Sequence, residues 1–463
     1  MSAIQEYLDS LQEKTITVIG MGVSNTPLIR MLLRAGLKVT VRDKAPRERS
    51  EELAGELESL GAQLILGGDY LEDLHEDLIF RTPGLSPNTP QVKAAVEQGS
   101  ELTSEMELFF RTCPCQIIAV TGSDGKTTTT TIITEFLKAA GYNVYVGGNI
   151  GKPLLPDVGD MEPDDMAVLE LSSFQLMTMD QSPNISVFTN LAPNHLDYHH
   201  TMEEYTAAKT NIFRHQGEGD RVIFNLDCER LHPLAEMAPA GVVWFSRQER
   251  PEQGVYLRDG AIWLSNTQGS REVLPLDRIK IPGVHNIENY MAAIAAVDGL
   301  VPDQVVREVA DKFQGVEHRI EKVRELDGVT YYNDSIGTSP SRTAACLHAF
   351  AEAPGDMILI AGGYDKQIPF TTLALDIVER VQILVLNGAT AQAIRKAVEQ
   401  AETYKPGHPE IIMTDGFDQA VEEARKRAKS GDYVVLSPAC AAFDQFKNFV
   451  ERGKHFKELV QNF

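Results

Sequence analysis

The sequence has little positive charge relative to negative charge. It contains 43 lysine and arginine residues against 66 aspartate and glutamate residues, and its net charge is −23. Binding to a nucleic-acid backbone needs clustered basic side chains, so this balance argues against a general nucleic-acid surface. An anionic ligand must instead be held by a few local cations and by helix N-termini.

The sequence also lacks targeting signals, long apolar runs and a cysteine framework. Its start, MSAIQEYLDSLQEK, has no basic region and no apolar core, so we expect no signal peptide. No apolar run approaches the roughly 18 residues of a membrane helix, and we expect a cytoplasmic protein without membrane insertion. Among the five cysteines, Cys113 and Cys115 form a C-x-C pair without the second pair of a zinc site. We expect them to be small core or surface residues in a reducing compartment.

Apolar runs alternate with amphipathic stretches along the chain, which predicts an α/β fold with mainly parallel sheets. A length of 463 residues suggests about three domains. We place them at residues 1–111 (Rossmann-like), 112–315 (a P-loop-type ATPase domain) and 316–463 (Rossmann-like). Predicted strands lie near residues 15–20, 38–43, 62–68, 77–84, 116–121, 166–170, 185–191, 221–227, 329–335, 357–363, 381–388, 410–416 and 433–439. Residues 242–265 are richer in β signals, with a hairpin turn at Arg258–Gly260, and a helix is expected within 282–297.

The stretch AVTGSDGKTTTTT, Ala119–Thr131, resembles a phosphate-binding loop but is shorter than the common form. That form has a glycine six residues before its lysine, whereas here Val120 stands six before Lys126 and the first glycine, Gly122, stands four before it. The loop follows a predicted buried strand and precedes a helix from about Thr127.

This setting predicts that the backbone N–H groups of Ser123 to Thr127 face outward at the positive end of a helix, which suits a triphosphate. Lys126 would then reach the β- and γ-phosphates, and the Thr127 hydroxyl would bind Mg²⁺. The alternative is a glycine-rich turn with an incidental lysine, and the loop alone does not decide between the two.

Two further side chains favour a nucleotide site. Glu170 ends a second buried strand, where a carboxylate is costly unless it binds a cation. His195 follows a third strand. Ligands collect at the carboxyl edge of parallel sheets, so both residues are expected to converge on the loop. Singly, Glu170 could be an anion at a helix N-terminus and His195 a packed loop residue; together with Lys126 they indicate a Mg-ATP site.

Motifs in order along nearly the whole chain resemble the Mur ligase family, in which the short phosphate loop is normal. They are VTGSDGKTTT, GGNIGKP, LELSSFQL, NLAPNHLDYH, AAKTNIF, GVHNIENYMAA, EHRIE, NDSIGTSP and LSPACAAFDQFKNFVERG. The resemblance is to the branch that adds D-glutamate to UDP-N-acetylmuramoyl-L-alanine in peptidoglycan precursor synthesis. It implies an ATP-dependent ligase that acts through an acyl phosphate, with these two small molecules as its partners; we expect a monomer.

The resemblance also implies roles for individual residues. Lys126 and two Mg²⁺ ions would offset the repulsion between anions, with Thr127 and Glu170 at one ion and His195 helping at the second. Lys209 matches a carbamylated lysine, whose carbamate would be an anionic metal ligand; without the resemblance, a solvated helix lysine would be favoured. The catalytic set is therefore Lys126, Glu170, His195 and Lys209.

The resemblance implies three groups of binding residues. The expected ATP site comprises Gly122, Ser123, Asp124, Gly125, Lys126, Thr127, Thr128, Asn286 and Asn289 (adenine), Arg319 (phosphates) and Asp334 (ribose). The uridine-nucleotide substrate would contact Gly22, Val23, Ser24, Asn25, Asp43, Gly84, Asn149 and His195. D-Glutamate would contact Thr338, Lys366, Ala442 and Phe443.

Some positions depart from the family pattern. Ile336 stands where many relatives have lysine, Ala442 where a serine often touches D-glutamate, and Ala45 where some relatives offer an arginine to the nucleotide. These changes weaken the roles assigned to individual residues, but they do not change the expected class of reaction.

Three alternatives stay open. Another Mur ligase or a folylpolyglutamate synthase would share the central domain, although no D-N-P-R signature of the diamino-acid branch is present. A nucleotide-dependent switch without ligase chemistry is a second alternative. An NAD(P)-binding oxidoreductase is a third, disfavoured because Asn25 replaces the last glycine of the dinucleotide fingerprint in VIGMGVSN.

Overall fold

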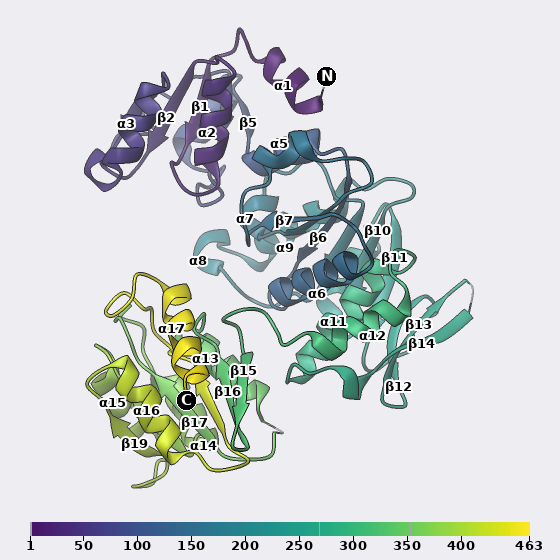
Figure 1. Cartoon of the computed structure of the whole chain (residues 1–463). Coiled ribbons are helices and arrows are strands. Elements are labelled where there is room, and N and C mark those ends of the chain that lie inside the picture. Colours follow the sequence, from purple (N-terminus) through teal and green to yellow (C-terminus); the bar gives the residue numbers. More distant parts are fainter. Residues whose placement is uncertain (1, 268, 352) are drawn as a thin grey trace. The chain divides into compact units, whose positions relative to one another are not determined.

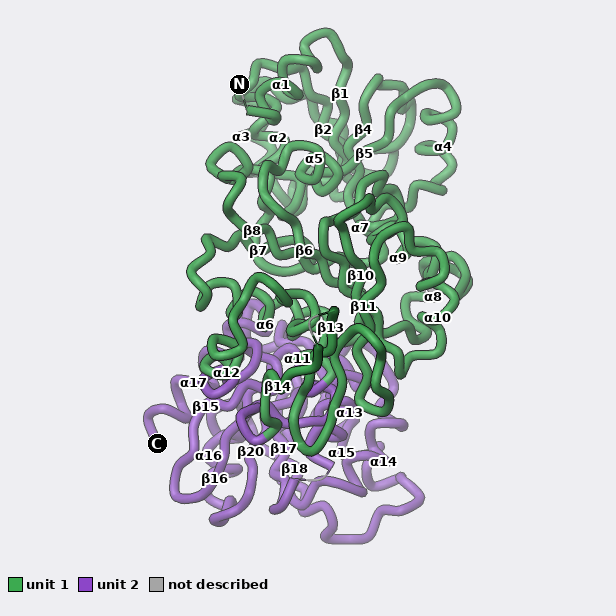
Figure 2. Tube along the Cα trace, turned by 90° about the vertical axis from the view of Figure 1, so that its right-hand side faces the viewer, with its two compact units in different colours: residues 1–276, 288–309 green, residues 277–287, 310–463 purple. Residues whose placement is uncertain are grey.

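The structure is a computed structural model that describes residues 2–267, 269–351 and 353–463, with the backbone alone at residues 196 and 197. Figure 1 shows successive α/β segments along the chain. The chain forms two compact units, residues 1–276 with 288–309 and residues 277–287 with 310–463 (Figure 2). The first unit contains two β-sheets and the second contains one. The predicted α/β fold with mainly parallel sheets is confirmed.

The first sheet is entirely parallel, in the order β3-β2-β1-β4-β5. Each residue of β1 is buried, as expected for a central strand covered on both faces. The sequence pattern missed β5, which is three residues long and begins with a charged side chain. The elements are α1 (Ala3–Ser10), β1 (Ile16–Ile19), α2 (Asn25–Arg34), β2 (Val39–Asp43), α3 (Glu51–Ser59), β3 (Gln63–Leu66), β4 (Leu78–Phe80), α4 (Pro90–Glu97), β5 (Glu101–Thr103) and α5 (Glu105–Thr112).

The second sheet has the order β14-β13-β12-β11-β10-β9-β6-β8-β7, with parallel pairing from β7 to β12 and antiparallel pairing in β12-β13-β14. Its strands are β6 (Gln116–Thr121), β7 (Val144–Gly148), β8 (Met166–Glu170), β9 (Ile185–Phe188), β10 (Arg221–Asn225), β11 (Gly241–Ser246), β12 (Gly254–Arg258), β13 (Ala261–Asn266) and β14 (Gly269–Pro275). Its helices are α6 (Lys126–Ala139), α7 (Ser173–Leu176), α8 (Leu196–His199), α9 (Met202–Arg214), α10 (His232–Ala235), α11 (Val284–Val297) and α12 (Asp303–Lys312).

The hairpin predicted in this sheet is confirmed. Arg258 pairs with Ala261, and the turn between them has positive φ at Asp259 (48°) and Gly260 (73°). Two left-handed residues are what a tight hairpin turn requires, because their twist matches that of the flanking strands.

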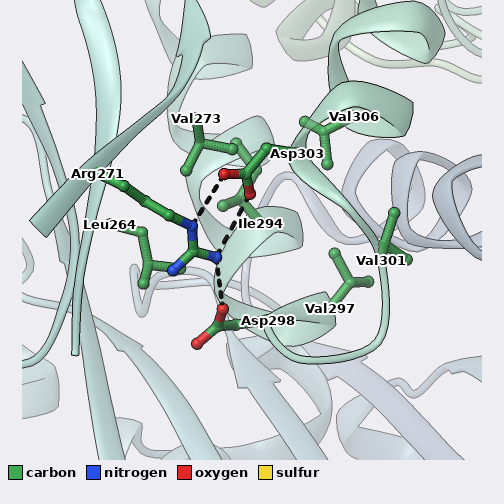
Figure 3. A pocket seen from close by; sticks show the side chains of 9 residues that line it. All are labelled: Leu264, Arg271, Val273, Ile294, Val297, Asp298, Val301, Asp303 and Val306. Carbon is green, nitrogen blue, oxygen red and sulfur yellow. Dashed lines mark hydrogen bonds and ion pairs between the residues drawn. The ribbon is translucent and has the colours of Figure 1, made fainter. Parts of the chain in front are cut away.

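Arg271 on the edge strand β14 forms ion pairs with residues at the ends of α11 and α12 (Figure 3). The guanidinium of Arg271 contacts Asp298 at 2.8 Å and Asp303 at 2.9 Å. Around these charges, the small pocket is lined by the apolar side chains of Leu264, Val273, Ile294, Val297, Val301 and Val306. This cluster holds the antiparallel extension against α11 and α12.

The third sheet has the order β15-β16-β20-β17-β18-β19, parallel except for the β15–β16 pair. The sequence pattern missed β15, because this edge strand reads Glu-Lys-Val-Arg-Glu-Leu and carries charges as exposed edges do. The elements are β15 (Glu321–Leu326), β16 (Val329–Asn333), α13 (Pro340–Ala349), β17 (Met357–Ala361), α14 (Thr371–Arg380), β18 (Ile383–Leu386), α15 (Ala391–Glu399), β19 (Glu410–Met413), α16 (Phe417–Arg427), β20 (Tyr433–Leu436) and α17 (Phe449–Gln461). Across the described part of the chain, every helix is too short or too polar to cross a membrane.

Candidate active site

The short loop between β6 and α6 depends on two glycines. Gly122 has φ +148°, and a Cβ there would lie 1.9 Å from Thr189 Oγ1. Gly125 has φ +80°, and a Cβ there would lie 2.5 Å from Asn289 Oδ1. Both the left-handed conformation and the crowding exclude larger residues. The predicted strand, loop and helix are therefore confirmed, with α6 beginning at Lys126.

One part of the prediction for this loop is wrong. The N–H of Ser123 donates to Asn190 O at 3.0 Å, and the N–H of Asp124 donates to Asn190 Oδ1 at 2.9 Å. These two groups therefore do not face outward. Thr189 adds a hydrogen bond from its hydroxyl to Asp124 O at 2.6 Å. The sequence interpretation missed Thr189 and Asn190; a polar pair directly after the buried strand β9, which pairs with β6, was the available signal.

Lys126 and Thr127 occupy the first turn of α6. The Lys126 ammonium is held over the loop, with Nζ donating to Gly122 O at 3.0 Å and to Ser123 O at 2.9 Å. The Thr127 hydroxyl donates to Glu170 Oε2 at 2.6 Å. The convergence of Glu170 on the loop is therefore confirmed, and its cause is that β8, which Glu170 ends, pairs with β6.

Glu170 is a buried carboxylate held by neutral donors. It is 2% exposed, and its second oxygen accepts a hydrogen bond from Asn149 Nδ2 at 2.7 Å. Asn149, predicted to contact the muramoyl substrate, thus lies beside the predicted metal site, and its substrate role stays a prediction.

The donors around Glu170 fit Mg²⁺. A hydroxyl and a carboxylate oxygen are the hard ligands that this ion prefers, and protein Mg²⁺ sites commonly supply one or two carboxylates while phosphates and water complete the shell. Among the described residues, no cluster of three or more His, Cys, Asp or Glu side chains could hold a metal by itself. The site therefore suits an ion that is shared with a phosphate ligand.

Lys209 on α9 is buried against the start of the loop. It is 1% exposed, and its Nζ donates to Gly122 O at 2.8 Å and to Thr121 Oγ1 at 3.1 Å. Burial, and then the charge of Lys126, hold the pKa of its amine well below the usual value. A solvated helix lysine is therefore excluded. The lowered pKa shifts the amine towards its neutral form, which is the form that can add CO₂.

His195 is exposed and has a left-handed backbone, with φ 53°. Its ring lies 5.0 Å from that of Phe174, centroid to centroid. Its predicted roles at a second ion and at the muramoyl substrate stay predictions.

At the end of β2, Asp43 forms hydrogen bonds that hold the start of the predicted nucleotide loop, Gly22–Asn25. Its carboxylate accepts the N–H of Met21 at 2.7 Å and that of Ala45 at 2.8 Å. Asn25 is buried at the start of α2 and donates to Ile19 O at 2.9 Å, so its amide shapes the loop. The contacts predicted for Gly22, Val23, Ser24 and Gly84 with a uridine nucleotide stay predictions.

In the second unit, the two groups predicted at one end of D-glutamate lie together, since Lys366 Nζ donates to Thr338 O at 3.0 Å.

Asp334, which is predicted to contact the ribose of ATP, is buried. Its Oδ2 accepts a hydrogen bond from Ser437 Oγ at 2.7 Å, and its Oδ1 accepts one from the Ile320 N–H at 3.3 Å. Burial raises the pKa of this carboxyl group to about 6.

The remaining predicted nucleotide contacts stay predictions. The carboxyl of Asp334 fixes the turn that presents Arg319, where the flanking His318 and Ile320 both have positive φ, 63° and 44°. Asn286 and Asn289 both lie on α11, where Asn286 donates to Pro282 O and Asn289 Oδ1 accepts from Thr129 Oγ1 at 3.2 Å.

Known families match this chain in three successive segments. Residues 14–104 match the Mur ligase MurD-like N-terminal domain, residues 120–297 the Mur ligase middle domain, and residues 318–440 the Mur ligase glutamate ligase domain. These segments follow the order of the three sheets, while our boundaries at 111/112 and 315/316 stay predictions.

Two relatives that match this chain over almost its whole length carry the same name. A UDP-N-acetylmuramoylalanine–D-glutamate ligase of Acetivibrio thermocellus is 47% identical over 463 residues, 99% of this chain and 98% of that protein. A protein of the same name from Ruminiclostridium cellulolyticum is 46% identical, covering 99% of each.

Solved structures share the fold at low identity. The alanine ligase MurC of Thermotoga maritima has a TM-score of 0.57 at 19% identity, covering 97% of this chain and 100% of that chain. MurF of the same organism, in complex with ADP, has a TM-score of 0.56 at 16% identity, covering 98% and 97%. With all three domain matches in order and relatives near half identity over the full length, the chain belongs to the Mur ligase family.

Proposed function

We propose that this protein is an ATP-dependent ligase that joins D-glutamate to UDP-N-acetylmuramoyl-L-alanine in the cytoplasm, acting as a monomer. The observation that carries the proposal is the compressed phosphate loop with the Thr127 hydroxyl 2.6 Å from the buried Glu170 carboxylate. The choice of substrates rests on the full-length relatives, which are named for that reaction.

The reaction begins when the terminal carboxylate of the muramoyl substrate attacks the γ-phosphorus of ATP, which gives an acyl phosphate and ADP. The amine of D-glutamate then attacks the acyl carbon, and phosphate leaves from a tetrahedral intermediate. The first step brings two anions together, so positive charge must be placed around them.

Lys126 supplies part of that charge from the first turn of α6, where its ammonium is already oriented over the loop by Gly122 O and Ser123 O. Bound Mg²⁺ would supply the rest by neutralising phosphate oxygens, with Thr127 and Glu170 as its protein ligands. Asn149 keeps the Glu170 carboxylate in position through Oε1 while Oε2 faces Thr127.

Carbamylation of Lys209 would add an anionic metal ligand in the same region. We propose that a second Mg²⁺ ion binds there, with His195 helping to hold it. Carbamylation is supported by the buried amine, whose lowered pKa shifts it towards the neutral form that reacts with CO₂. Lys209 hydrogen bonds to Gly122 O, as Lys126 does, so the two side chains meet at the base of the phosphate loop.

D-Glutamate needs donors at two separated points, because it carries two carboxylates and one nucleophilic amine. We assign Lys366 and Thr338 to one end and the N–H groups of Ala442 and Phe443 to the other. These parts are linked in the fold, since Tyr364 donates from its N–H to Ala441 O at 2.9 Å and its ring lies 5.8 Å from that of Phe443.

Trapping of the acyl phosphate tests the proposal. With ATP, Mg²⁺ and UDP-N-acetylmuramoyl-L-alanine, hydroxylamine should yield the hydroxamate of the muramoyl substrate together with ADP. ADP formation that needs no muramoyl substrate, with no hydroxamate, would instead indicate a nucleotide switch.

A further inference from the structure

Arg452 is a buried cation that joins two loops of the third domain. It lies in the first turns of α17 and is 2% exposed. Its guanidinium donates to Ser335 Oγ, Ser335 O and Cys440 O at 3.0 Å each, and to Ala441 O at 3.2 Å. Ser335 follows β16 and leads towards Thr338, whereas Cys440 and Ala441 follow β20 and lead to Ala442 and Phe443.

The charge of Arg452 is met by neutral oxygens. Throughout the described ranges, no carboxylate forms a hydrogen bond or ion pair with its guanidinium. Burial lowers the pKa of Arg452 to about 10, so the side chain remains protonated at neutral pH. The charges of Asp444 and Asp334 favour the cation from a distance, but a buried charge that no carboxylate contacts is still costly. The charge therefore calls for an explanation in function.

The hydrogen bond to Ala441 O acts on the next residue. The Ala441 carbonyl accepts from Arg452 and also from the N–H of Tyr364 at 2.9 Å. The N–H of the same peptide unit belongs to Ala442 and points the opposite way, because the peptide is trans. Two donors on a carbonyl, one of them cationic, polarise the peptide and make its N–H a stronger donor.

The Ala442 N–H is the group that we assign to a carboxylate of D-glutamate. Ala442 is 2% exposed, and its carbonyl accepts from the N–H groups of Gln445 and Phe446. Its own N–H donates to no protein acceptor within the part of the chain that the structure describes. Gly363 permits this arrangement, since a Cβ there would lie 2.4 Å from Ala441 O and 3.2 Å from Arg452 Nη1.

We propose that Arg452 is a positioning residue for D-glutamate: it holds the Ser335 and Cys440–Ala442 loops in register and polarises the Ala442 N–H toward the substrate's carboxylate. The inference rests on the proposed function. Arg452 itself touches no substrate; the peptide transmits its charge to the pocket.

The test compares Arg452→Lys and Arg452→Met with His455→Gln as the matched control. His455 lies on the same helix, pairs with Asp418 at 2.6 Å and has its ring 5.7 Å from that of Phe446, and within the described ranges it forms no hydrogen bond to the Ser335 or Cys440–Ala442 loop. Lysine keeps the charge but cannot donate hydrogen bonds to all four acceptors as the planar guanidinium does. Methionine removes the charge. The readouts are the KM for each of the three substrates, kcat from phosphate release, and the melting temperature.

We expect the KM for D-glutamate to rise at least tenfold in Arg452→Lys and further in Arg452→Met, while the KM values for ATP and the muramoyl substrate stay within twofold. Tenfold corresponds to about 1.4 kcal/mol. The control should match the wild type. An unchanged KM for D-glutamate in Arg452→Lys, or a parallel rise in all three KM values with a lower melting temperature, would overturn the inference. If Arg452→Met does not fold, Arg452→Lys alone decides. A wild type that does not use D-glutamate would instead refute the proposed function.

Discussion

Two substitutions at Glu170 can distinguish its structural role from its catalytic role, because each of its two carboxylate oxygens accepts a hydrogen bond from a different side chain. Glu170→Ala would leave the Thr127 hydroxyl and the Asn149 amide without their acceptor at a site that is 2% exposed. An unmade buried hydrogen bond costs about 1–3 kcal/mol, so the two together should cost about 2–6 kcal/mol of unfolding free energy.

Glu170→Gln keeps the shape and can satisfy both neighbours. Its carbonyl oxygen can accept from Asn149, and its amide can donate to the Thr127 hydroxyl, which can also act as an acceptor. We therefore expect a stability within about 1 kcal/mol of the wild type. The negative charge is lost, however, and kcat should fall at least about a hundredfold, as when one preorganised electrostatic group is removed.

Urea unfolding followed by circular dichroism gives the stabilities, and phosphate release at a series of Mg²⁺ concentrations gives the activities. The glutamine variant should need more Mg²⁺ for half-maximal rate. A glutamine variant with wild-type turnover would remove the carboxylate from the metal site. An alanine variant as stable as the wild type would show that the two hydrogen bonds do not hold this site together.

Three further predictions concern single side chains. Lys126→Ala should abolish phosphate release while circular dichroism and the melting temperature stay close to the wild type, and an unchanged kcat would exclude its role at the phosphates. Lys209→Ala should be nearly inactive and partly rescued by short carboxylic acids that occupy the anionic position; full activity without rescue would exclude a carbamate. Burial raises the pKa of Glu105 from 4.5 to about 7, so its stability contribution is lost as pH rises through that range. Glu105→Gln should therefore gain up to about 3 kcal/mol over the wild type at pH 8 and little at pH 5 in urea unfolding, whereas an equal difference at both pH values would contradict this.

Sequence reasoning located strands that are buried on both faces, since these read as continuous apolar runs. It missed the edge strands β5, β7, β14 and β15, because a short, half-buried or charged edge strand carries no such signal. β5 pairs with β4, which lies on the far side of α4 in the sequence, whereas β15 pairs with the adjacent strand β16, with Leu326 opposite Val329. In both cases the partner strand defines the element, and the strand's own apolar pattern does not.

The candidate site was predictable in its residues and less so in its contacts. Gly122, Lys126, Thr127 and Glu170 follow from the loop and from the strand end beside it. The polar pair after β9 could have indicated that Asn190 lies near the loop. Its hydrogen bonds from the Ser123 and Asp124 N–H groups could not be predicted, because they depend on the exact path of the segment after β9. The burial of Lys209 likewise arises from the packing of α9 against the loop, and the sequence alone favoured a solvated side chain.

The measurement that tests the central claim most directly is the product formed from a panel of amino acids. ATP, Mg²⁺ and UDP-N-acetylmuramoyl-L-alanine would be incubated with D-glutamate, L-glutamate or meso-diaminopimelate, and the product identified by mass spectrometry alongside phosphate release. We predict one amide product, from D-glutamate, because the L-enantiomer with both carboxylates anchored would point its amine away from the acyl phosphate, and lost alignment costs about 7–11 kcal/mol. Faster reaction with L-glutamate or diaminopimelate would contradict the assignment.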